Sequence, residues 1–353
     1  MRRQSSANTD TEMYSRDDTQ RGGAVKSVLL FFLGLAALAA AAIGVGGYLA
    51  YREAQLPGPS TAPTIVLFEP GSSVSSIARD LTDAGVIRYK DLFIAAVRLR
   101  GEQDALKAGE YEIPAGASVL DIIAILVDGK SILHQLTFAE GLTTAQILRL
   151  IEAEEILKGD LTVAPAEGEL LPETYAFTRG SSRDELVRRM EKEQDKLLDA
   201  LWDDRALELP FSTREDALIL ASIVEKETGV AGERQRVAGV FVNRLRRGMR
   251  LQSDPTVIYG ITGGEPLGGG LRQSQLKAET PYNTYVIRGL PPTPIANPGR
   301  ASIEAVLDPL DTDDLYFVAD GTGGHAFATN LNDHLANVAR WRAIERQRKQ
   351  EGG

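Results

Sequence analysis

Residues 27–51, SVLLFFLGLAALAAAAIGVGGYLAY, form one uninterrupted apolar run without a charged side chain. A helix of this length crosses the hydrocarbon core of a bilayer, which is about 30 Å thick. Basic residues such as Arg21 and Lys26 precede the run, whereas after Arg52 the next basic residue is Arg79. The positive-inside rule therefore predicts a cytoplasmic N-terminus and a chain that lies outside the membrane after the run. A cleaved signal peptide is the alternative, but its apolar region is usually much shorter, so we predict an uncleaved single-pass anchor.

Composition excludes several classes of function. The formal net charge of -10 argues against a nucleic-acid-binding protein, which needs a basic surface to neutralise phosphates. The 353 residues include no cysteine, which removes disulfides, thiol nucleophiles and zinc-thiolate sites. The three histidines, His134, His325 and His334, are not arranged in a metal-binding motif such as HExxH. We therefore expect no metal and no cofactor.

A strand–turn–helix pattern recurs three times after the apolar run. The expected strands are residues 64–68, 109–113 and 134–138, and the helical segments that follow them are PGSSVSSIARDL, AGASVLDIIAIL and EGLTTAQILRLI. Each segment has a glycine turn, a serine or threonine that can cap a helix, and apolar residues at helical spacing. Modules of this kind resemble the LysM-type glycan-binding modules of cell walls. Generic α/β packing is the alternative explanation of the same pattern.

The remaining chain predicts a larger mixed domain, so the expected fold class is α+β. We predict helices at 181–205 and 332–350, a strand at 314–320, and a helix that opens with the capping sequence STRED at 212–216. Residues 260–299 are rich in Gly, Pro and Thr and lack periodicity, which is typical of a long functional loop. The predicted divisions are a disordered tail (1–26), the span (27–51), a linker (52–63), a LysM-like subdomain (64–160) and a final domain (161–350).

The sequence LILASIVEKET, residues 218–228, places two glutamates at the end of an apolar helix. On a helix, Glu227 lies on the same face as Leu220, Ile223 and Val224. Bulky aliphatic neighbours remove water from a carboxyl group and raise its pKa, which keeps a general acid protonated near neutral pH. Glu227 is therefore the predicted proton donor and Glu225 the second choice. A solvated helix end, with the acids paired to nearby cations, is the alternative.

Two later segments carry side chains that suit a sugar. The first, residues 243–260, contains Asn243, Gln252 and Asp254. The second, residues 280–299, contains Tyr282, Asn283, Thr284 and Tyr285 in a loop stiffened by prolines. Aromatic rings stack on sugar faces, and amides and hydroxyls pair with sugar hydroxyls. We predict that these seven residues bind the substrate.

The motifs ASIVEKET, VFVNRLRRGMRLQSDPTVIYG, TPYNTYVIRGLPPTPIANPG and LYFVADGTGGHAF, in this order, resemble the YceG-like family of endolytic murein transglycosylases. The resemblance extends from the apolar run nearly to the C-terminus. It implies a single-pass inner-membrane protein with a LysM-like subdomain and a catalytic domain outside the cytoplasm. It also implies that the second acid of the EKET motif, Glu227, is catalytic. The expected substrate is nascent peptidoglycan, and peptidoglycan synthases in the membrane are the expected partners.

The implied reaction cleaves the β-1,4 bond between N-acetylmuramic acid and N-acetylglucosamine, forms a 1,6-anhydro ring and terminates strand elongation. Glu227 would first protonate the glycosidic oxygen and then, as a carboxylate, accept the proton of the C6 hydroxyl. Two alternatives stay open at this point. A muramidase-type hydrolase would need a second carboxylate, for which Asp254 is the candidate. A non-catalytic anchor would bind wall glycan through the repeated module and recruit synthases.

Overall fold

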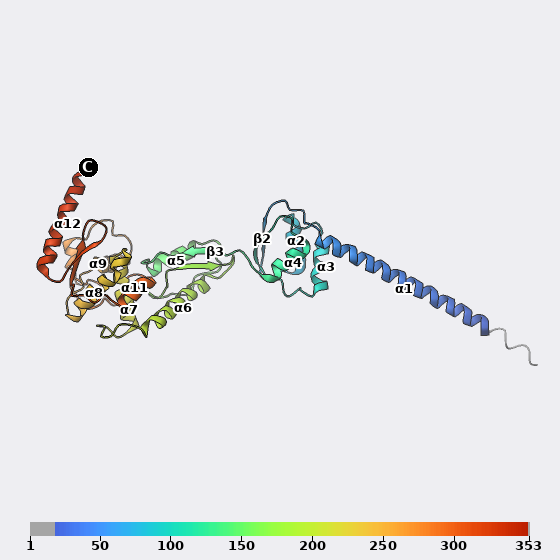
Figure 1. The fold of residues 1–353 in the computed structure, drawn as a ribbon, viewed down its shortest axis with the longest axis horizontal. Helices are drawn as coiled ribbons and strands as arrows, with labels where there is room; N and C mark the ends of the chain where they lie inside the picture. Colours follow the sequence, from blue (N-terminus) through green and yellow to red (C-terminus); the bar gives the residue numbers. More distant parts are fainter. Residues whose placement is uncertain (1–17, 352–353) are drawn as a thin grey trace, which may run out of the picture. The chain divides into compact units, whose positions relative to one another are not determined.

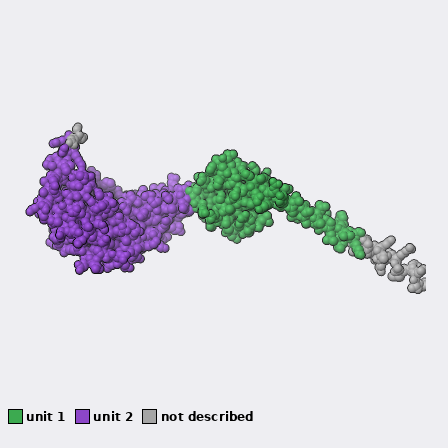
Figure 2. Space-filling view, viewed as in Figure 1, with its two compact units in different colours: residues 1–132 green, residues 133–353 purple. Residues whose placement is uncertain are grey.

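The computed structural model describes residues 18–351. The described chain forms two compact units that meet between Ile132 and Leu133 (Figures 1 and 2). The predicted disorder of the N-terminal tail falls largely on residues 1–17, which lie outside the described residues. The described chain begins with a helix at Asp18, and the disorder of the tail stays a prediction. The predicted mixture of helices and strands is confirmed in both units.

The first element, helix α1 (Asp18–Gln55), contains the whole predicted span. Residues 26–55 are long and apolar enough to cross a membrane, and the 18-residue window of highest hydropathy among them is not buried against the rest of the protein. The side chains of the run, from Val28 to Tyr51, are exposed on all faces of the helix. An apolar helix that packs against nothing needs a non-aqueous environment, which fits a membrane anchor.

Unit 1 contains the first two of the three predicted repeats. Strands β1 (Thr64–Phe68) and β2 (Gly109–Ile113) pair antiparallel, with Val66 opposite Tyr111. Helices α2 (Val74–Asp83) and α4 (Val119–Asp128) begin at the predicted serine caps. Helix α3 (Lys90–Arg100), which the repeat pattern did not include, completes the core with Phe93 and Val97.

The end of α1 is built into the core of unit 1. Ala54 is buried in the same hydrophobic cluster as Phe93. The segment predicted as an extended linker packs against the unit, because the Gly58 N–H donates to the Gly116 carbonyl (3.2 Å) and the Gly116 N–H donates to the Ser60 carbonyl (2.8 Å). A Cβ atom on Gly58 would lie 2.6 Å from the Ala117 carbonyl oxygen, so only glycine fits this contact.

The third repeat belongs to unit 2, so the division expected at residue 160 lies inside that unit. Strand β3 (His134–Thr137) pairs antiparallel with β4 (Thr174–Phe177), which the sequence did not reveal. Helices α5 (Thr144–Ala153) and α6 (Arg183–Trp202) enclose a core that includes Ile147 and Met190. The turn of this repeat also contacts the helix that bears the glutamates, because Lys226 Nζ donates to the Gly141 carbonyl (3.1 Å).

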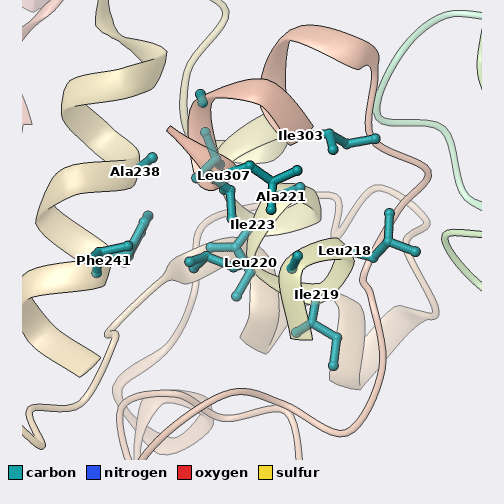
Figure 3. Packing of buried hydrophobic residues seen from close by; sticks show 14 of the residues in the cluster. Leu218, Ile219, Leu220, Ala221, Ile223, Ala238, Phe241, Ile303 and Leu307 are labelled. Atoms are coloured by element: carbon teal, nitrogen blue, oxygen red, sulfur yellow. The ribbon is translucent and has the colours of Figure 1, made fainter. Parts of the chain in front are cut away.

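The largest core of unit 2 surrounds helix α7 (Arg214–Glu227). Its residues 217–224 are all buried, and they pack against α8 (Arg234–Arg246) and α11 (Arg300–Leu307) (Figure 3). Leu220 and Ile223 of α7, Phe241 of α8 and Leu307 of α11 belong to this cluster. An α-helix buried on every face of its middle turns is a rigid support for whatever follows it.

The remaining elements of unit 2 are short. They are η1 (Ala231–Glu233), α9 (Asp254–Thr262), α10 (Gln273–Leu276), the antiparallel pair β5 (Tyr316–Ala319) and β6 (His325–Ala328), and α12 (Leu331–Glu351). The irregular segment predicted at 260–299 contains only the end of α9 and the single turn α10. The strand predicted at 314–320 and the terminal helix predicted at 332–350 are confirmed as β5 and α12.

Candidate active site

Glu227 is the last residue of α7. The helix begins after Thr213, whose side-chain oxygen accepts a hydrogen bond from the Asp216 N–H (3.1 Å), as the STRED sequence predicts. It ends at Thr228, where the backbone turns to an extended conformation with φ of -140°. Leu220, Ile223 and Val224 are fully buried in the core. The helix is therefore held at both ends and along its length, and its final side chain has a defined position.

The surroundings of the Glu227 carboxyl group favour its protonated form. Burial raises its pKa from an ordinary value of 4.5 to about 7. A hydrogen bond from the Ser253 hydroxyl, 2.5 Å from Glu227 Oε1, opposes this effect by stabilising the carboxylate. The nearby charge of Asp254 raises the pKa, whereas His325 and Arg244 lower it. The side chain as a whole keeps some exposure to solvent, so the proton can be exchanged with a ligand.

Ser253 is fixed by contacts on both sides of its backbone. Its N–H donates to the Thr284 hydroxyl (2.9 Å), and its carbonyl accepts a hydrogen bond from the Thr256 hydroxyl (2.7 Å). Ser253 itself is buried, so its hydroxyl has little freedom to leave Glu227. The preceding residue, Gln252, has a φ of 55°, an uncommon conformation for a residue with a side chain. The predicted binding residues include the neighbours Gln252 and Asp254 but not Ser253, which lies between them.

Glu225 is bonded differently from Glu227. Its side chain is 7% exposed, with one carboxyl oxygen 3.9 Å from Arg234 Nη2. The other oxygen accepts a hydrogen bond from the Gly299 N–H (3.1 Å). Both carboxyl oxygens of Glu225 therefore have partners within the protein. The choice of Glu227 over Glu225 as the acid stays a prediction.

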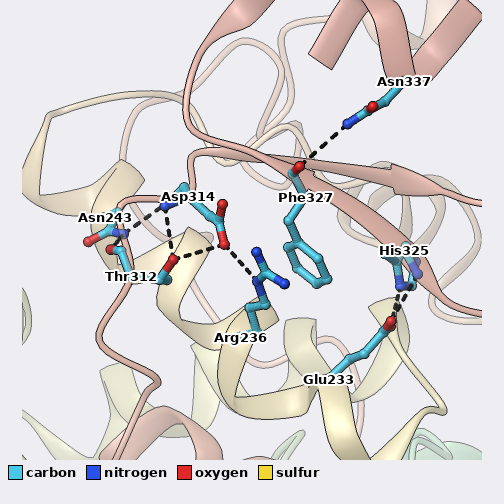
Figure 4. A network of polar contacts seen from close by, with 8 residues as sticks. All are labelled: Glu233, Arg236, Asn243, Thr312, Asp314, His325, Phe327 and Asn337. Carbon is cyan, nitrogen blue, oxygen red and sulfur yellow. Dashed lines mark hydrogen bonds and ion pairs between the residues drawn. The ribbon is translucent and has the colours of Figure 1, made fainter. Parts of the chain in front are cut away.

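Three of the predicted substrate-binding residues use their side chains to hold the protein together. Asn243 donates to the carbonyls of Thr312 (2.5 Å) and Asp314 (3.1 Å), as Figure 4 shows. Asn283 and Thr284 are fully buried. Asn283 donates to the Ala278 carbonyl (2.6 Å), and its own side-chain oxygen accepts from the Tyr285 N–H (3.0 Å). These polar atoms already have protein partners, so the three side chains support the loops around Glu227. Their role in binding a sugar stays a prediction.

The other predicted residues present groups nearer to solvent. The Tyr285 hydroxyl donates to Asp254 Oδ1 (2.6 Å), and Asp254 is exposed. Tyr285 and Asp254 both lie within electrostatic reach of Glu227. Gln252 is exposed, and its side-chain oxygen accepts from Arg244 (3.3 Å). The Tyr282 ring packs at a tilt of 59° against the Tyr259 ring, with ring centroids 5.1 Å apart. Gln252, Asp254 and Tyr285 thus form one polar group beside the acid.

A histidine and a glutamate that were not selected from the sequence lie beside the same site. His325 Nδ1 is 2.7 Å from Glu233 Oε2, and the His325 N–H donates to Glu233 Oε1 (2.9 Å) (Figure 4). The carboxylate favours a proton on Nδ1 of the imidazole. The signal in the sequence was the GHAF motif, which follows a glycine-rich turn. Among the described residues, no group of three His, Asp or Glu side chains could hold a metal ion.

Comparison with known proteins places this arrangement in a family. The model of the YceG-like family matches residues 66–340, which include α7, Ser253 and His325. This chain belongs to the YceG-like family. A relative from Bacillus subtilis (strain 168) named endolytic murein transglycosylase is 30% identical over 82% of this chain and 89% of its own length. An endolytic murein transglycosylase from Streptococcus pneumoniae (strain D39) is 29% identical over 89% of this chain and 65% of its own length.

A solved structure agrees with the family assignment. The crystal structure of a yceG-like protein from Listeria monocytogenes is 31% identical in sequence, with a TM-score of 0.52. The match covers 78% of this chain and 99% of that chain. The YceG-like fold therefore accounts for most of the described residues, and the resemblance predicted from the sequence motifs is confirmed.

Proposed function

We propose that this family member is an endolytic lytic transglycosylase that cleaves the MurNAc-β-1,4-GlcNAc bond of peptidoglycan strands. The observation that carries the proposal is Glu227, a carboxyl group with a pKa of about 7 at the rigid end of α7. At neutral pH such a group exists in both protonation states, and the reaction needs the same group first as an acid and then as a base. The names of the relatives support this choice of substrate and reaction.

In the proposed mechanism, the two oxygens of Glu227 have different tasks. Oε1 accepts the hydrogen bond from Ser253, so Oε2 carries the proton. Oε2 donates this proton to the glycosidic oxygen as the C1–O bond breaks through an oxocarbenium-like state. The resulting carboxylate then removes the proton of the C6 hydroxyl, whose oxygen attacks C1 and closes the 1,6-anhydro ring. The Ser253 hydroxyl stabilises the carboxylate between the two steps.

The polar group beside Glu227 would position the sugar. Asp254 and Gln252 are exposed and can accept or donate hydrogen bonds to sugar hydroxyls. Tyr285 holds Asp254 in place through its hydroxyl and offers an aromatic face. Tyr282 belongs to the same loop and is partly exposed. These binding roles extend the proposal that Glu227 is catalytic, and they depend on it.

The rest of the proposal concerns the location and the other unit. We propose that α1 anchors the protein in the inner membrane with the N-terminus in the cytoplasm, so that both units lie outside. The first two repeats, in unit 1, would form the LysM-like part that binds glycan, and the catalytic domain would lie in unit 2. Anchoring beside the membrane would place the enzyme near peptidoglycan synthases and nascent strands, where cleavage terminates elongation.

The test compares the full chain with the Glu227→Gln variant on uncrosslinked glycan strands. Mass spectrometry of the products should detect 1,6-anhydro ends with the wild type and no new ends with the variant. Glu225→Gln is the matched control, because it removes the neighbouring carboxylate of the same helix and should retain the chemistry. Products with reducing ends alone would indicate a hydrolase that uses Asp254 to activate water. Unchanged cleavage by Glu227→Gln would refute the catalytic role, and no cleavage by the wild type would favour the non-catalytic anchor.

A further inference from the structure

Helix α3 lies beside the end of α1. At one end, Glu53 and Leu56 of the α1 terminus line a small cavity with Tyr89 and Leu92. Arg88 Nη1 is also 3.9 Å from Glu53 Oε1. These contacts place the beginning of α3 beside the residues that follow the apolar run (Figure 1).

The other end of α3 returns to the apolar run itself. Arg100, the last residue of α3, lies within electrostatic reach of Tyr51, the last residue of the run. This proximity places the final turn of α3 near Tyr51. Tyrosines at the end of a membrane span usually lie among the lipid headgroups.

The side chains of Arg98 and Leu99 in this final turn are exposed on the surface of the protein. Leu99 is 89% exposed, while Phe93 and Val97 of the same helix are fully buried. Arg98 is exposed beside Leu99. Arg100 forms an ion pair with Glu102 (2.8 Å), so the charge of that acid is already compensated. A leucine this exposed, next to an exposed arginine and at headgroup level, has the chemistry of a membrane contact.

We propose that the last turn of α3, Arg98–Leu99–Arg100, is a second contact of this protein with the bilayer that α1 spans. The Leu99 side chain enters the interfacial layer, and the Arg98 guanidinium binds lipid phosphate oxygens. We choose the bilayer as the partner of this turn because the turn lies near Tyr51, where the span of α1 ends. Two contact points instead of one restrict the rotation and tilt of unit 1 on the membrane. The inference rests on the proposed anchor α1 and is independent of the catalytic proposal.

The absence of native cysteine allows a direct test. The full-length Leu99→Cys variant is labelled with an environment-sensitive fluorophore and reconstituted in vesicles of phosphatidylethanolamine and phosphatidylglycerol. Leu38→Cys, within the span, is the positive control. Ile65→Cys is the exposed control in the same unit, because β1 pairs with β2, which lies away from α3 (Figure 1). A lipid with a nitroxide near its headgroup serves as the quencher.

We expect a blue shift and strong quenching for the label at 99, quenching at 38, and neither effect at 65. Adding Arg98→Ser to the Leu99→Cys variant should reduce the quenching at 99 by loss of the phosphate contact. A label at 99 that behaves like the one at 65, while the label at 38 is in lipid, overturns the proposal and leaves the turn free for a protein partner. If the label at position 38 is in water, α1 does not span the bilayer and the anchor on which the proposal rests is refuted. This outcome does not depend on whether the protein is catalytically active.

Discussion

Replacing Glu227 by glutamine tests the central electrostatic claim without any substrate. The pKa of Glu227 is 4.5 in an unfolded chain and about 7 in the folded protein. At a pH between these two pKa values, the unfolded state has released a proton that the folded state keeps. The free energy of unfolding therefore falls as the pH rises. The stability from this group is fully present below pH 4.5 and is lost once the pH has passed about 7. A difference of about 2.5 pKa units corresponds to about 3 kcal/mol at most, at 1.36 kcal/mol per unit.

The assay is urea unfolding of the full chain in detergent, followed by tryptophan fluorescence over a range of pH. Trp202 packs against the core that contains α7, and Trp341→Phe removes the other tryptophan. Glutamine cannot ionise, so the Glu227→Gln protein lacks this loss of stability. We expect the stability of the variant relative to the parent protein to rise by about 3 kcal/mol between about pH 4 and about pH 9.

Glu225→Gln is the control, because it makes the same change in the same helix and removes the contacts of that carboxylate with Arg234 and the Gly299 N–H. It should lower the stability through the loss of these contacts. Parallel curves for Glu227→Gln and its parent would refute the reasoning, since they would mean that Glu227 has the same pKa in the folded and unfolded chain.

Three further predictions concern neighbouring residues. Ser253→Ala should move the alkaline limb of the pH–activity profile upward by about one pH unit, because it removes a donor to the Glu227 carboxylate; Ser222→Ala, a buried serine of the same helix, should leave the limb in place. Asn283→Ala should destabilise the protein by about 2 kcal/mol in urea unfolding, because buried carbonyls lose their donor. Thr213→Ala should cost about 1 kcal/mol in the same measurement through the lost helix cap, and Thr213→Ser should restore most of it.

The sequence predicted the parts of the fold that depend on local patterns. The caps of α2, α4, α5 and α7 were visible because serine or threonine precedes each apolar period. The apolar surroundings of Glu227 were predictable for the same reason, since Ile223 and Val224 are four and three residues away from it in sequence. The raised pKa follows from that local packing.

Features that depend on distant residues were not predictable in this way. Strand β4 is short and has its partner β3 about 40 residues earlier, so no local pattern marks it. Ser253 is 26 residues after Glu227, and only the folded loop brings its hydroxyl to the carboxyl group. The burial of Asn283 and Thr284 was not predictable either, because a polar residue in a loop looks the same in sequence whether it faces solvent or a buried carbonyl.

The burial of Ala54 and the close contact at Gly58 have a mechanical consequence. The end of α1 is part of the core of unit 1. Thinning or thickening of a bilayer changes the tilt of a helix that spans it. With α1 in a membrane, as proposed, each such change would tilt unit 1 as well.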